Sequence, residues 1–396
     1  MTHFKMTRRA VALAALAVTL PVAALAQSKD PVRIGVVSSK SGVFAQQGEE
    51  AIRGALFAVE EANAKGGVDG RKVEAQVADD ESSPESGRRV AEKLARDGFN
   101  LLTGAIPSTI PLAIGPNLER WDAAYFGVLS KSDKITGDSC KPRMIRTNHS
   151  DAMDMAMIGE WAKGFKEKTF ATLAADYVWG RDSAESFAKA VKGQGKDVKL
   201  QLYPPMGTKD FSPYIAQLKE AKVDAVWVAE TGRDAIAFVK QAQEFGLIPQ
   251  TKLIGHSLLQ NFMMDATGKA LEGVPGNVTY SPDIDNARNK SFVAAFKAKF
   301  NRLPTDNEGL GYNGVNVILE GVKLAKSAKP GDVTKALSGA SVDTLFGRAQ
   351  VRAADNQMVL PNFVGRAKWV DGQMRAPIEQ VFPASIVPAA SPLCKM

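Results

Sequence analysis

Cysteine and histidine are scarce in this chain of 396 residues, which holds two cysteines and three histidines. Cys140 and Cys394 lie far apart and no Cys-x-x-Cys pair is present, so the spacing excludes a zinc cluster built on thiolates. The sequence also lacks a Gly-x-x-x-x-Gly-Lys-Ser/Thr segment, so the chain is not expected to be an ATPase itself. After residue 26, no apolar run is long enough to cross a bilayer.

The chain has little excess charge of either sign. It carries 50 lysines and arginines against 43 acidic residues, and aromatic residues make up only 7% of it. The basic residues are scattered and do not form a block interleaved with aromatics, so nucleic-acid binding is not indicated.

The first residues have the pattern of a targeting segment. Lys5, Arg8 and Arg9 precede an apolar run over 10–26 that ends in a small-x-small site at Ala26. This pattern predicts a secretory signal peptide over 1–26, cleaved after Ala26. A membrane anchor is the alternative, but the run is shorter than about 18 uninterrupted apolar residues. Cleavage would lower the formal charge from +7 to +4 and leave an exported, periplasmic protein.

Both cysteines belong to the mature chain. In an oxidising compartment a disulfide between Cys140 and Cys394 is favoured over two free thiols. This disulfide would tether the tail over 381–396, which is rich in proline, to the region around Cys140.

A strand, a loop, a helix and a second strand follow one another over 32–80. The apolar run 32–37 leads into the small polar residues of 38–42, and Val73, Ala75 and Val77 point to one side of a later strand. Between them, spacings of four and three predict one helical face, which is closed at Gly66-Gly67 and made of Ile52, Leu56, Val59 and Ala62. This βαβ order predicts a parallel sheet with ligand-binding groups at the carboxyl ends of its strands.

The same alternation continues through most of the chain. Further strands are expected at 99–103, 123–129, 169–175, 198–202, 223–229 and 252–255. Helices are expected between them, and later at 291–300, 312–328 and 332–337, before a strand-like segment at 363–369. The pattern restarts near residue 150, which indicates two α/β domains built alike.

Several segments of the first 80 residues carry a resemblance to a known family. They are Arg33-Ile-Gly-Val, Ser41-Gly42, Gly48, Glu61-Ala-Asn-Ala-Lys-Gly-Gly-Val68 and Asp79-Asp80. Their order resembles the opening of type I periplasmic solute-binding proteins of ABC importers, and within these the branched-chain amino acid and amide receptors (the leucine/isoleucine/valine-binding protein family).

The resemblance implies an α/β fold of two Rossmann-like lobes with parallel sheets, joined by a three-segment hinge. On this interpretation 27–145 and 281–345 form the first lobe, and 146–280 and 346–380 form the second. The chain would cross between the lobes at 144–147, at 277–280 and near 345–347.

The resemblance also implies a ligand site between the lobes. The residues it assigns to the first lobe are Phe44, Gln47, Ser108, Thr109, Leu129, Ser130 and Lys131. Those it assigns to the second lobe are Tyr177, Trp179, Glu230, Ser257 and Tyr280. A ligand carboxylate is expected to accept hydrogen bonds from the Ser108 hydroxyl and from backbone N–H groups, a role compatible with Ser108 as a simple helix cap.

Two positions depart from the branched-chain receptors. His256-Ser257 stands where those receptors place an acid for the ligand ammonium, and Lys131 stands near their hydroxyl. Losing an anion and gaining a cation favours a carboxylate ligand, aromatic among others, over an ordinary α-amino acid. Glu230 is the alternative partner for an ammonium.

Two short segments resemble motifs that are found in enzymes. Gly255-His256-Ser257 resembles the start of a nucleophile elbow, but Leu259 stands where the motif needs glycine. Gly309-Leu-Gly311-Tyr-Asn-Gly314 matches a dinucleotide fingerprint but follows no expected strand, so close helix packing explains it better.

The expected function is therefore that of a binding protein and not of an enzyme. It would capture a small organic solute, amino-acid-like or an organic or aromatic carboxylate, as a monomer without cofactor or metal, and deliver it to an ABC permease and ATPase complex in the inner membrane. The alternatives are a periplasmic sensor for a signalling partner and an exported serine hydrolase using Ser257.

Overall fold

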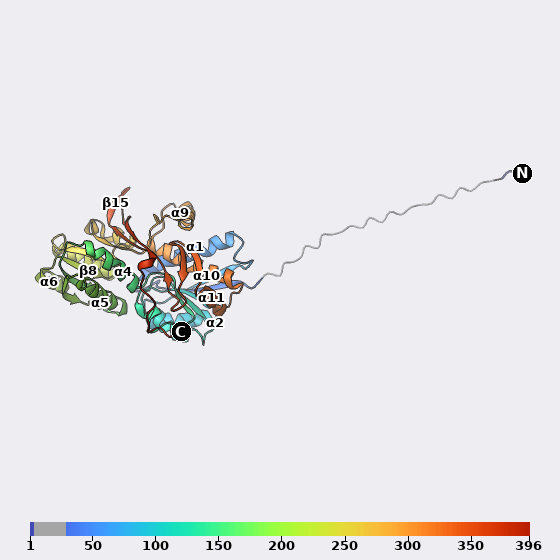
Figure 1. The fold of residues 1–396 in the computed structure, drawn as a ribbon. Coiled ribbons are helices and arrows are strands. Elements are labelled where there is room, and N and C mark those ends of the chain that lie inside the picture. The colour runs from blue at the N-terminus through green and yellow to red at the C-terminus, as the bar shows by residue number, and fades with distance from the viewer. Residues whose placement is uncertain (4–28) are drawn as a thin grey trace.

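The computed structural model describes residues 1–3 and 29–396. The signal-peptide cleavage expected after Ala26 therefore lies outside the described residues. The described chain forms two lobes that lie side by side, one carrying α1, α2, α10 and α11 and the other α5, α6 and β8 (Figure 1). Within these residues, no helix has both the length and the apolar character that crossing a bilayer requires.

The first lobe is built on a five-stranded parallel sheet in the order β2-β1-β3-β4-β5. Its strands are β1 (Val32–Ser38), β2 (Val73–Asp79), β3 (Leu101–Gly104), β4 (Ala124–Gly127) and β5 (Met144–Arg146). In the register of this sheet, Ile34 of β1 lies between Ala75 and Leu101. The inner strands β1, β3 and β4 are mostly apolar and buried because helices cover both faces of the sheet, whereas the edge strand β2 is only partly buried.

The second lobe repeats this winding. Its parallel strands follow the order β7-β6-β8-β9-β10, and β14 and β17 extend the β10 edge in the antiparallel sense. The strands are β6 (Thr169–Ala174), β7 (Asp197–Leu202), β8 (Ala225–Ala229), β9 (Lys252–Gly255), β10 (Pro275–Val278), β14 (Asn362–Arg366) and β17 (Ile378–Phe382). The expected parallel sheet is confirmed for β6 to β10, and two antiparallel strands extend it.

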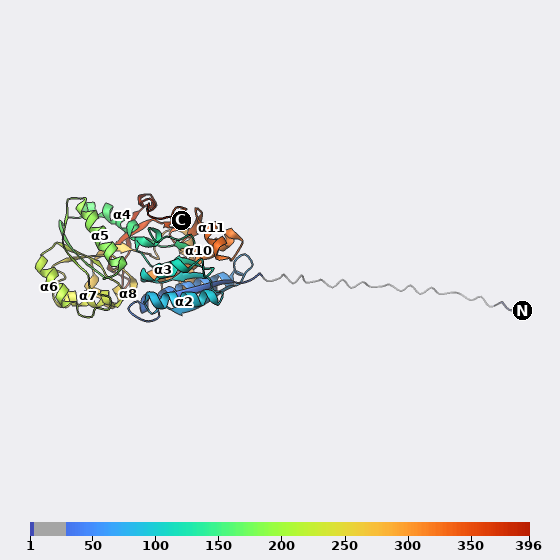
Figure 2. The same cartoon turned by 90° about the horizontal axis from the view of Figure 1, so that it is seen from below.

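The helices pack on both sheets, and Figure 2 shows α6, α7 and α8 in one lobe and α2 and α3 in the other. They are α1 (Ala45–Ala64), α2 (Pro84–Arg96), α3 (Thr109–Ile114), α4 (Asp151–Trp161), α5 (Val178–Lys192), α6 (Ser212–Ala221), α7 (Gly232–Glu244), α8 (Asn261–Thr267), α9 (Ala287–Phe300), α10 (Asp306–Ala325) and α11 (Pro330–Leu337). Short strands complete the fold: β11 (Ser341–Thr344), β12 (Gly347–Val351), β13 (Met358–Val359), β15 (Lys368–Val370) and β16 (Gln373–Arg375).

Helices α1 and α10 approach each other through small residues. A Cβ atom on Gly54 would lie 2.0 Å from the Glu308 backbone oxygen, and one on Gly311 would lie 2.1 Å from the Ala51 backbone oxygen. The buried face of α1 therefore runs along its glycine and alanine positions. Leu56, which the spacing predicts on the buried face, is instead 40% exposed, and its neighbour Phe57 is buried against Tyr312 of α10.

The chain passes between the lobes three times. It leaves the first sheet after β5, returns after β10 to pack α10 against α1, and crosses again before β14 pairs with β10. The residue limits of the lobes, 27–145 with 281–345 and 146–280 with 346–380, stay predictions.

The two cysteines form the expected disulfide, which joins the C-terminal segment to the loop before β5. The Cα atoms of Cys140 and Cys394 are 5.6 Å apart, and 254 positions separate the two residues in the sequence. A cross-link that closes so long a loop restricts the unfolded chain strongly.

The paired variant Cys140→Ser with Cys394→Ser is expected to lose about 2–5 kcal/mol of unfolding free energy. Urea unfolding followed by circular dichroism measures this loss. Dithiothreitol should lower the unfolding midpoint of the wild-type protein and leave that of the variant unchanged. Equal midpoints for the oxidised wild type and the variant would show that the disulfide does not contribute to stability.

Candidate functional site

A cavity lies between the two lobes, at the carboxyl ends of both parallel sheets. About 390 Å³ of space not filled by protein atoms lies here, part of it open to solvent. Its wall is formed by Gln47, Ile106, Ser108, Leu129, Lys131, Tyr177, Trp179, Thr231, Ser257, Gln260, Thr279 and Leu310. In open α/β sheets ligands bind at this edge, near the point where the strand order reverses.

Seven of the residues that the sequence nominated lie on this wall: Gln47, Ser108, Leu129, Lys131, Tyr177, Trp179 and Ser257. Five others lie behind it or away from it: Phe44, Thr109, Ser130, Glu230 and Tyr280.

The side chains behind the wall have other partners. Ser130 Oγ donates to the backbone oxygens of Ala105 and Ile106, at 3.2 Å each. Tyr280 Oη donates to Asn289 Oδ1 at 2.7 Å, in an aromatic part of the core.

Glu230 is buried, and one of its carboxyl oxygens has no hydrogen-bond partner in the structure. Burial and nearby Asp234 raise the pKa of Glu230 well above its ordinary value. Glu230 itself does not line the cavity, and its neighbour Thr231 is the residue that reaches it.

Gln47 and Trp179 enter the cavity from equivalent turns in the two lobes. Each is followed by a glycine packed on the loop after the preceding strand. A Cβ atom on Gly48 would lie 1.8 Å from the Ser39 oxygen, and one on Gly180 would lie 2.1 Å from the Ala175 oxygen. Because the start of each helix packs closely against the end of the preceding strand, the side chains of Gln47 and Trp179 are held at the edge of the cavity.

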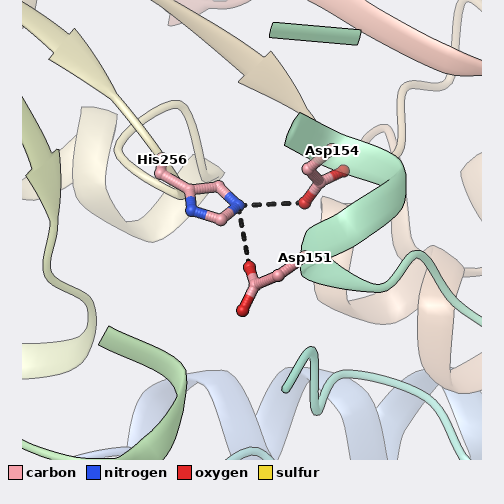
Figure 3. Close-up of side chains that lie close together, drawn as sticks. All are labelled: Asp151, Asp154 and His256. Atoms are coloured by element: carbon pink, nitrogen blue, oxygen red, sulfur yellow. Dashed lines mark hydrogen bonds and ion pairs between the residues drawn. The ribbon is translucent and has the colours of Figure 1, made fainter. Parts of the chain in front are cut away.

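Lys131 belongs to a buried network that crosses the lobes. Its Nζ lies 2.5 Å from Asp154 Oδ2, and His256 Nε2 lies 2.9 Å from the same oxygen. Figure 3 shows His256, from the loop after β9, facing Asp154 and Asp151 on the first turns of α4. Lys131 therefore does not present an isolated positive charge, because Asp154 balances it.

Hydrogen bonds define the role of the His256 ring. Trp227 Nε1 donates to Ser183 Oγ at 3.0 Å, and Ser183 Oγ lies 2.7 Å from His256 Nδ1. Because a carboxylate only accepts, His256 Nε2 carries the hydrogen that it shares with Asp154. Burial lowers the pKa of His256, so the ring is neutral. Burial alone would raise the pKa of Asp154, but Lys131 and His256 hold it below its ordinary value.

Asp151 is the member of this cluster without a partner. It is fully buried, and neither of its carboxyl oxygens accepts a hydrogen bond in the structure. Burial and the Asp133 and Asp154 carboxylates raise the pKa of Asp151 well above its ordinary range. The spacing of Asp151, Asp154 and His256 resembles a set of metal ligands. However, His256 Nε2 carries a hydrogen and Lys131 already supplies the cation, so the donor set does not fit a metal ion.

The geometry does not provide Ser257 with a general base. Both ring nitrogens of His256 are engaged by Ser183 and Asp154, and His149 Nε2 lies 2.8 Å from the Pro361 oxygen. A serine nucleophile needs a histidine nitrogen free to take its proton.

Amide side chains close the other side of the cavity. Gln47 Nε2 donates to Thr231 Oγ1 at 2.9 Å and to Gln260 Oε1 at 3.1 Å. Gln260 Nε2 donates to Asp306 Oδ2 at 3.0 Å, and Asn261 N donates to Asp306 Oδ1 at 3.0 Å. These bonds join the start of α1 and the start of α10 to the loop before α8, so they hold the lobes together.

Two buried acids beside this contact predict a pH dependence of stability. Burial and nearby Asp306 raise the pKa of Glu50 to about 8, and burial raises that of Asp306 to about 6. The folded protein therefore holds these protons more tightly than the unfolded chain, whose carboxyls titrate near their ordinary values of 4.5 and 3.8. The unfolding free energy is expected to fall as pH rises from about 4 to 8.

Glu50→Gln is expected to remove much of this fall, on the order of 3 kcal/mol between pH 5 and pH 8. Urea unfolding at several pH values measures it. Glu49→Gln, at the exposed neighbouring position, is the matched control and should keep the wild-type slope. Parallel pH profiles for Glu50→Gln and wild type would contradict the prediction.

Five wall residues are not among the site residues nominated from the sequence: Ile106, Thr231, Gln260, Thr279 and Leu310. Gln260 ends the loop that follows β9, and a loop after a parallel strand is a signal that could have found it. Thr279 lies just after β10, and Leu310 lies on the first turns of α10, which the sequence placed outside a helix. The positions of Thr279 and Leu310 at the cavity depend on how the chain crosses between the lobes and brings α10 to the cavity.

Comparison with known proteins agrees with this geometry. A family model described as periplasmic binding protein matches residues 31–373. The leucine-, isoleucine-, valine-, threonine- and alanine-binding protein of Pseudomonas aeruginosa is 29% identical over 352 residues, covering 87% of this chain and 91% of that protein. A Leu/Ile/Val-binding protein homolog of Brucella suis is 25% identical and covers 91% of this chain and 94% of the relative.

Solved structures show the same fold. A solute-binding protein of an ABC transporter from Rhodopseudomonas palustris BisB5, in complex with 3,4-dihydroxybenzoic acid, matches with a TM-score of 0.82 and 25% identity over 90% of this chain and 98% of that one. Another from R. palustris, in complex with benzoate, matches with a TM-score of 0.83 and 23% identity over 92% of this chain and 100% of that one.

The family and these relatives are binding proteins and not enzymes, and the cavity lacks the base that a serine hydrolase needs. The family match extends over nearly all of the described chain, whose two-lobe fold has a cavity between the lobes. The chain therefore belongs to the periplasmic binding protein family and has the two-lobe type I fold.

Proposed function

We propose that this protein is the periplasmic solute receptor of an ABC importer, which captures a small organic solute between its lobes and delivers it to a membrane permease. The solute is amino-acid-like or an organic or aromatic carboxylate. The signal peptide over 1–26 directs the chain to the periplasm, where it acts as a monomer.

One observation carries the proposal: the cavity is closed by side chains of both lobes, at the carboxyl ends of both parallel sheets. A solute that touches both walls at once stabilises the closed arrangement, and its binding shifts the population towards that state. The permease would then recognise the closed form. Support comes from relatives that include both amino-acid-binding proteins and receptors solved with aromatic acids.

Isothermal titration of the ligand-free mature protein tests the proposal. The panel holds L-leucine, L-alanine, benzoate, 4-hydroxybenzoate and short-chain aliphatic acids. We expect binding of at least one class with one site per chain, and we expect the compound to be recovered chemically unchanged. In cells of the source organism, deletion of this chain should abolish uptake of the compound that binds. Unchanged uptake after deletion would contradict the transport role.

A further inference from the structure

We infer that the cavity is built for a small acid carrying a hydrogen-bond-donating group, a hydroxyl in the simplest case, at the end opposite its carboxylate. This inference rests on the proposed function and names the class of solute. It follows from where the cavity wall keeps unused hydrogen-bond donors and where it keeps an unused acceptor.

Three residues of the wall have hydrogen-bond donors that are not fully used. The Lys131 ammonium has three N–H groups, of which one is directed at Asp154 Oδ2. Ser108 Oγ accepts from the Ser132 backbone N–H at 3.2 Å, so its own hydrogen is free to donate. Trp179 Nε1, an obligatory donor, is buried and has no partner in the structure. A ligand carboxylate supplies the acceptors that these groups lack.

Gln47, in contrast, has an unused hydrogen-bond acceptor. Because a carboxylate only accepts, Asp306 orients Gln260 with Nε2 towards itself and Oε1 towards Gln47. Gln260 Oε1 in turn requires the Nε2 of Gln47 to face it. Gln47 Oε1 is thereby turned away from this network. It is buried without a partner, on a side chain that lines the cavity.

The residues with unused donors and the residue with the unused acceptor belong to different hydrogen-bond networks. Trp179 and Lys131 surround His256, with the Trp179 and His256 ring centres 5.3 Å apart, whereas Gln47 belongs to the amides that end at Asp306. The apolar side chains of the wall are Ile106, Leu129 and Leu310, and the Tyr177 and Trp179 rings lie 5.9 Å apart. They suit a flat ring between the two polar ends.

This division of donors and acceptor discriminates between solute classes. An α-amino acid carries its ammonium and carboxylate on one carbon, so it cannot serve both ends of the cavity at once. A ring with a carboxylate at one end and a hydroxyl at the other satisfies Trp179 Nε1 and Gln47 Oε1 together. A buried acceptor that is left without its donor costs affinity, so the acid lacking the hydroxyl is rejected.

The test compares 4-hydroxybenzoate with benzoate by isothermal titration, in the wild-type mature protein and in Gln47→Met. We expect wild type to bind 4-hydroxybenzoate at least tenfold more tightly than benzoate and Gln47→Met to reduce this ratio to near one. Thr231→Val is the matched control. It removes a partner of Gln47 Nε2 and leaves Oε1 in place, so it should weaken both acids by the same factor and keep the ratio. Trp179→Phe, which keeps an aromatic ring and removes the N–H, should weaken both acids equally.

A wild-type ratio near one, or a ratio that Gln47→Met leaves unchanged, would overturn the inference. Tighter binding of L-leucine than of 4-hydroxybenzoate would also overturn it, while leaving the receptor function standing. Binding of no amino acid and no small organic acid would overturn the inference and the proposed function together.

Discussion

Gly54→Ala is expected to lower the unfolding free energy by about 3 kcal/mol or more, or to prevent folding. The added Cβ would lie 2.0 Å from the Glu308 backbone oxygen, a distance that no rotamer change can relieve. Helix α10 cannot easily move away, because the Glu308 carboxylate is held by Arg53 and by Arg302, with N···O distances of 2.5 Å. Urea unfolding of the purified variant measures the loss.

The matched control is Gly159→Ala. Gly159 lies inside α4 with no atom within 4 Å of the position of an added Cβ. Alanine at such a helical site is expected to gain about 0.5–1 kcal/mol, because glycine loses more backbone entropy on folding. If Gly54→Ala also gained stability, the close contact between α1 and α10 would be disproved.

Lys131→Met is expected to destabilise the protein by about 3–5 kcal/mol. The side chains of Lys131 and Asp154 are only 7% and 3% exposed, so removing the ammonium leaves a buried carboxylate without its counter-charge. His256 offsets little of the loss, because its ring is neutral and donates a single hydrogen bond. Thermal and urea unfolding at neutral pH measure the effect in the ligand-free protein.

Adding Asp154→Asn to Lys131→Met should recover much of this loss. The asparagine keeps an oxygen for His256 Nε2 and carries no charge, so the buried network is neutral again. If Lys131→Met alone were as stable as wild type, the prediction would be wrong. Asp154 would then be solvated by water, and the double variant would have no loss of stability to recover.

The alternation of strands and helices was readable from the sequence because buried parallel strands are short apolar runs with clear ends. The segment 252–255 was predicted as a strand and is β9, and the expected strand 169–175 is β6 with one residue fewer. The start of α10 was missed by six residues, since Gly309 and Gly311 have poor helix propensity. Packing against α1 requires those glycines and outweighs their propensity.

The candidate site was predictable where it depends on strand ends and not where it depends on pairing across the lobes. Ser108, Leu129 and Lys131 follow strands of the first sheet, and parallel topology brings such loops to one edge. The partners of Lys131 were not predictable. Asp154 lies on a helix that carries no motif, and His256 reaches it from 102 positions away in the chain. The expectation of an unbalanced cation at Lys131 arose from reading it without these partners.

The repeated strand order, β2-β1-β3-β4 in one lobe and β7-β6-β8-β9 in the other, makes this chain resemble a dimer of similar subunits whose interface is the solute cavity. Opening then corresponds to partial dissociation of that dimer. The crossing segments keep the halves at a high effective concentration, so reclosing needs no bimolecular encounter. A solute therefore has to supply only the free-energy difference between the open and closed arrangements of the two lobes. A few hydrogen bonds to each lobe are enough to decide which arrangement is more populated.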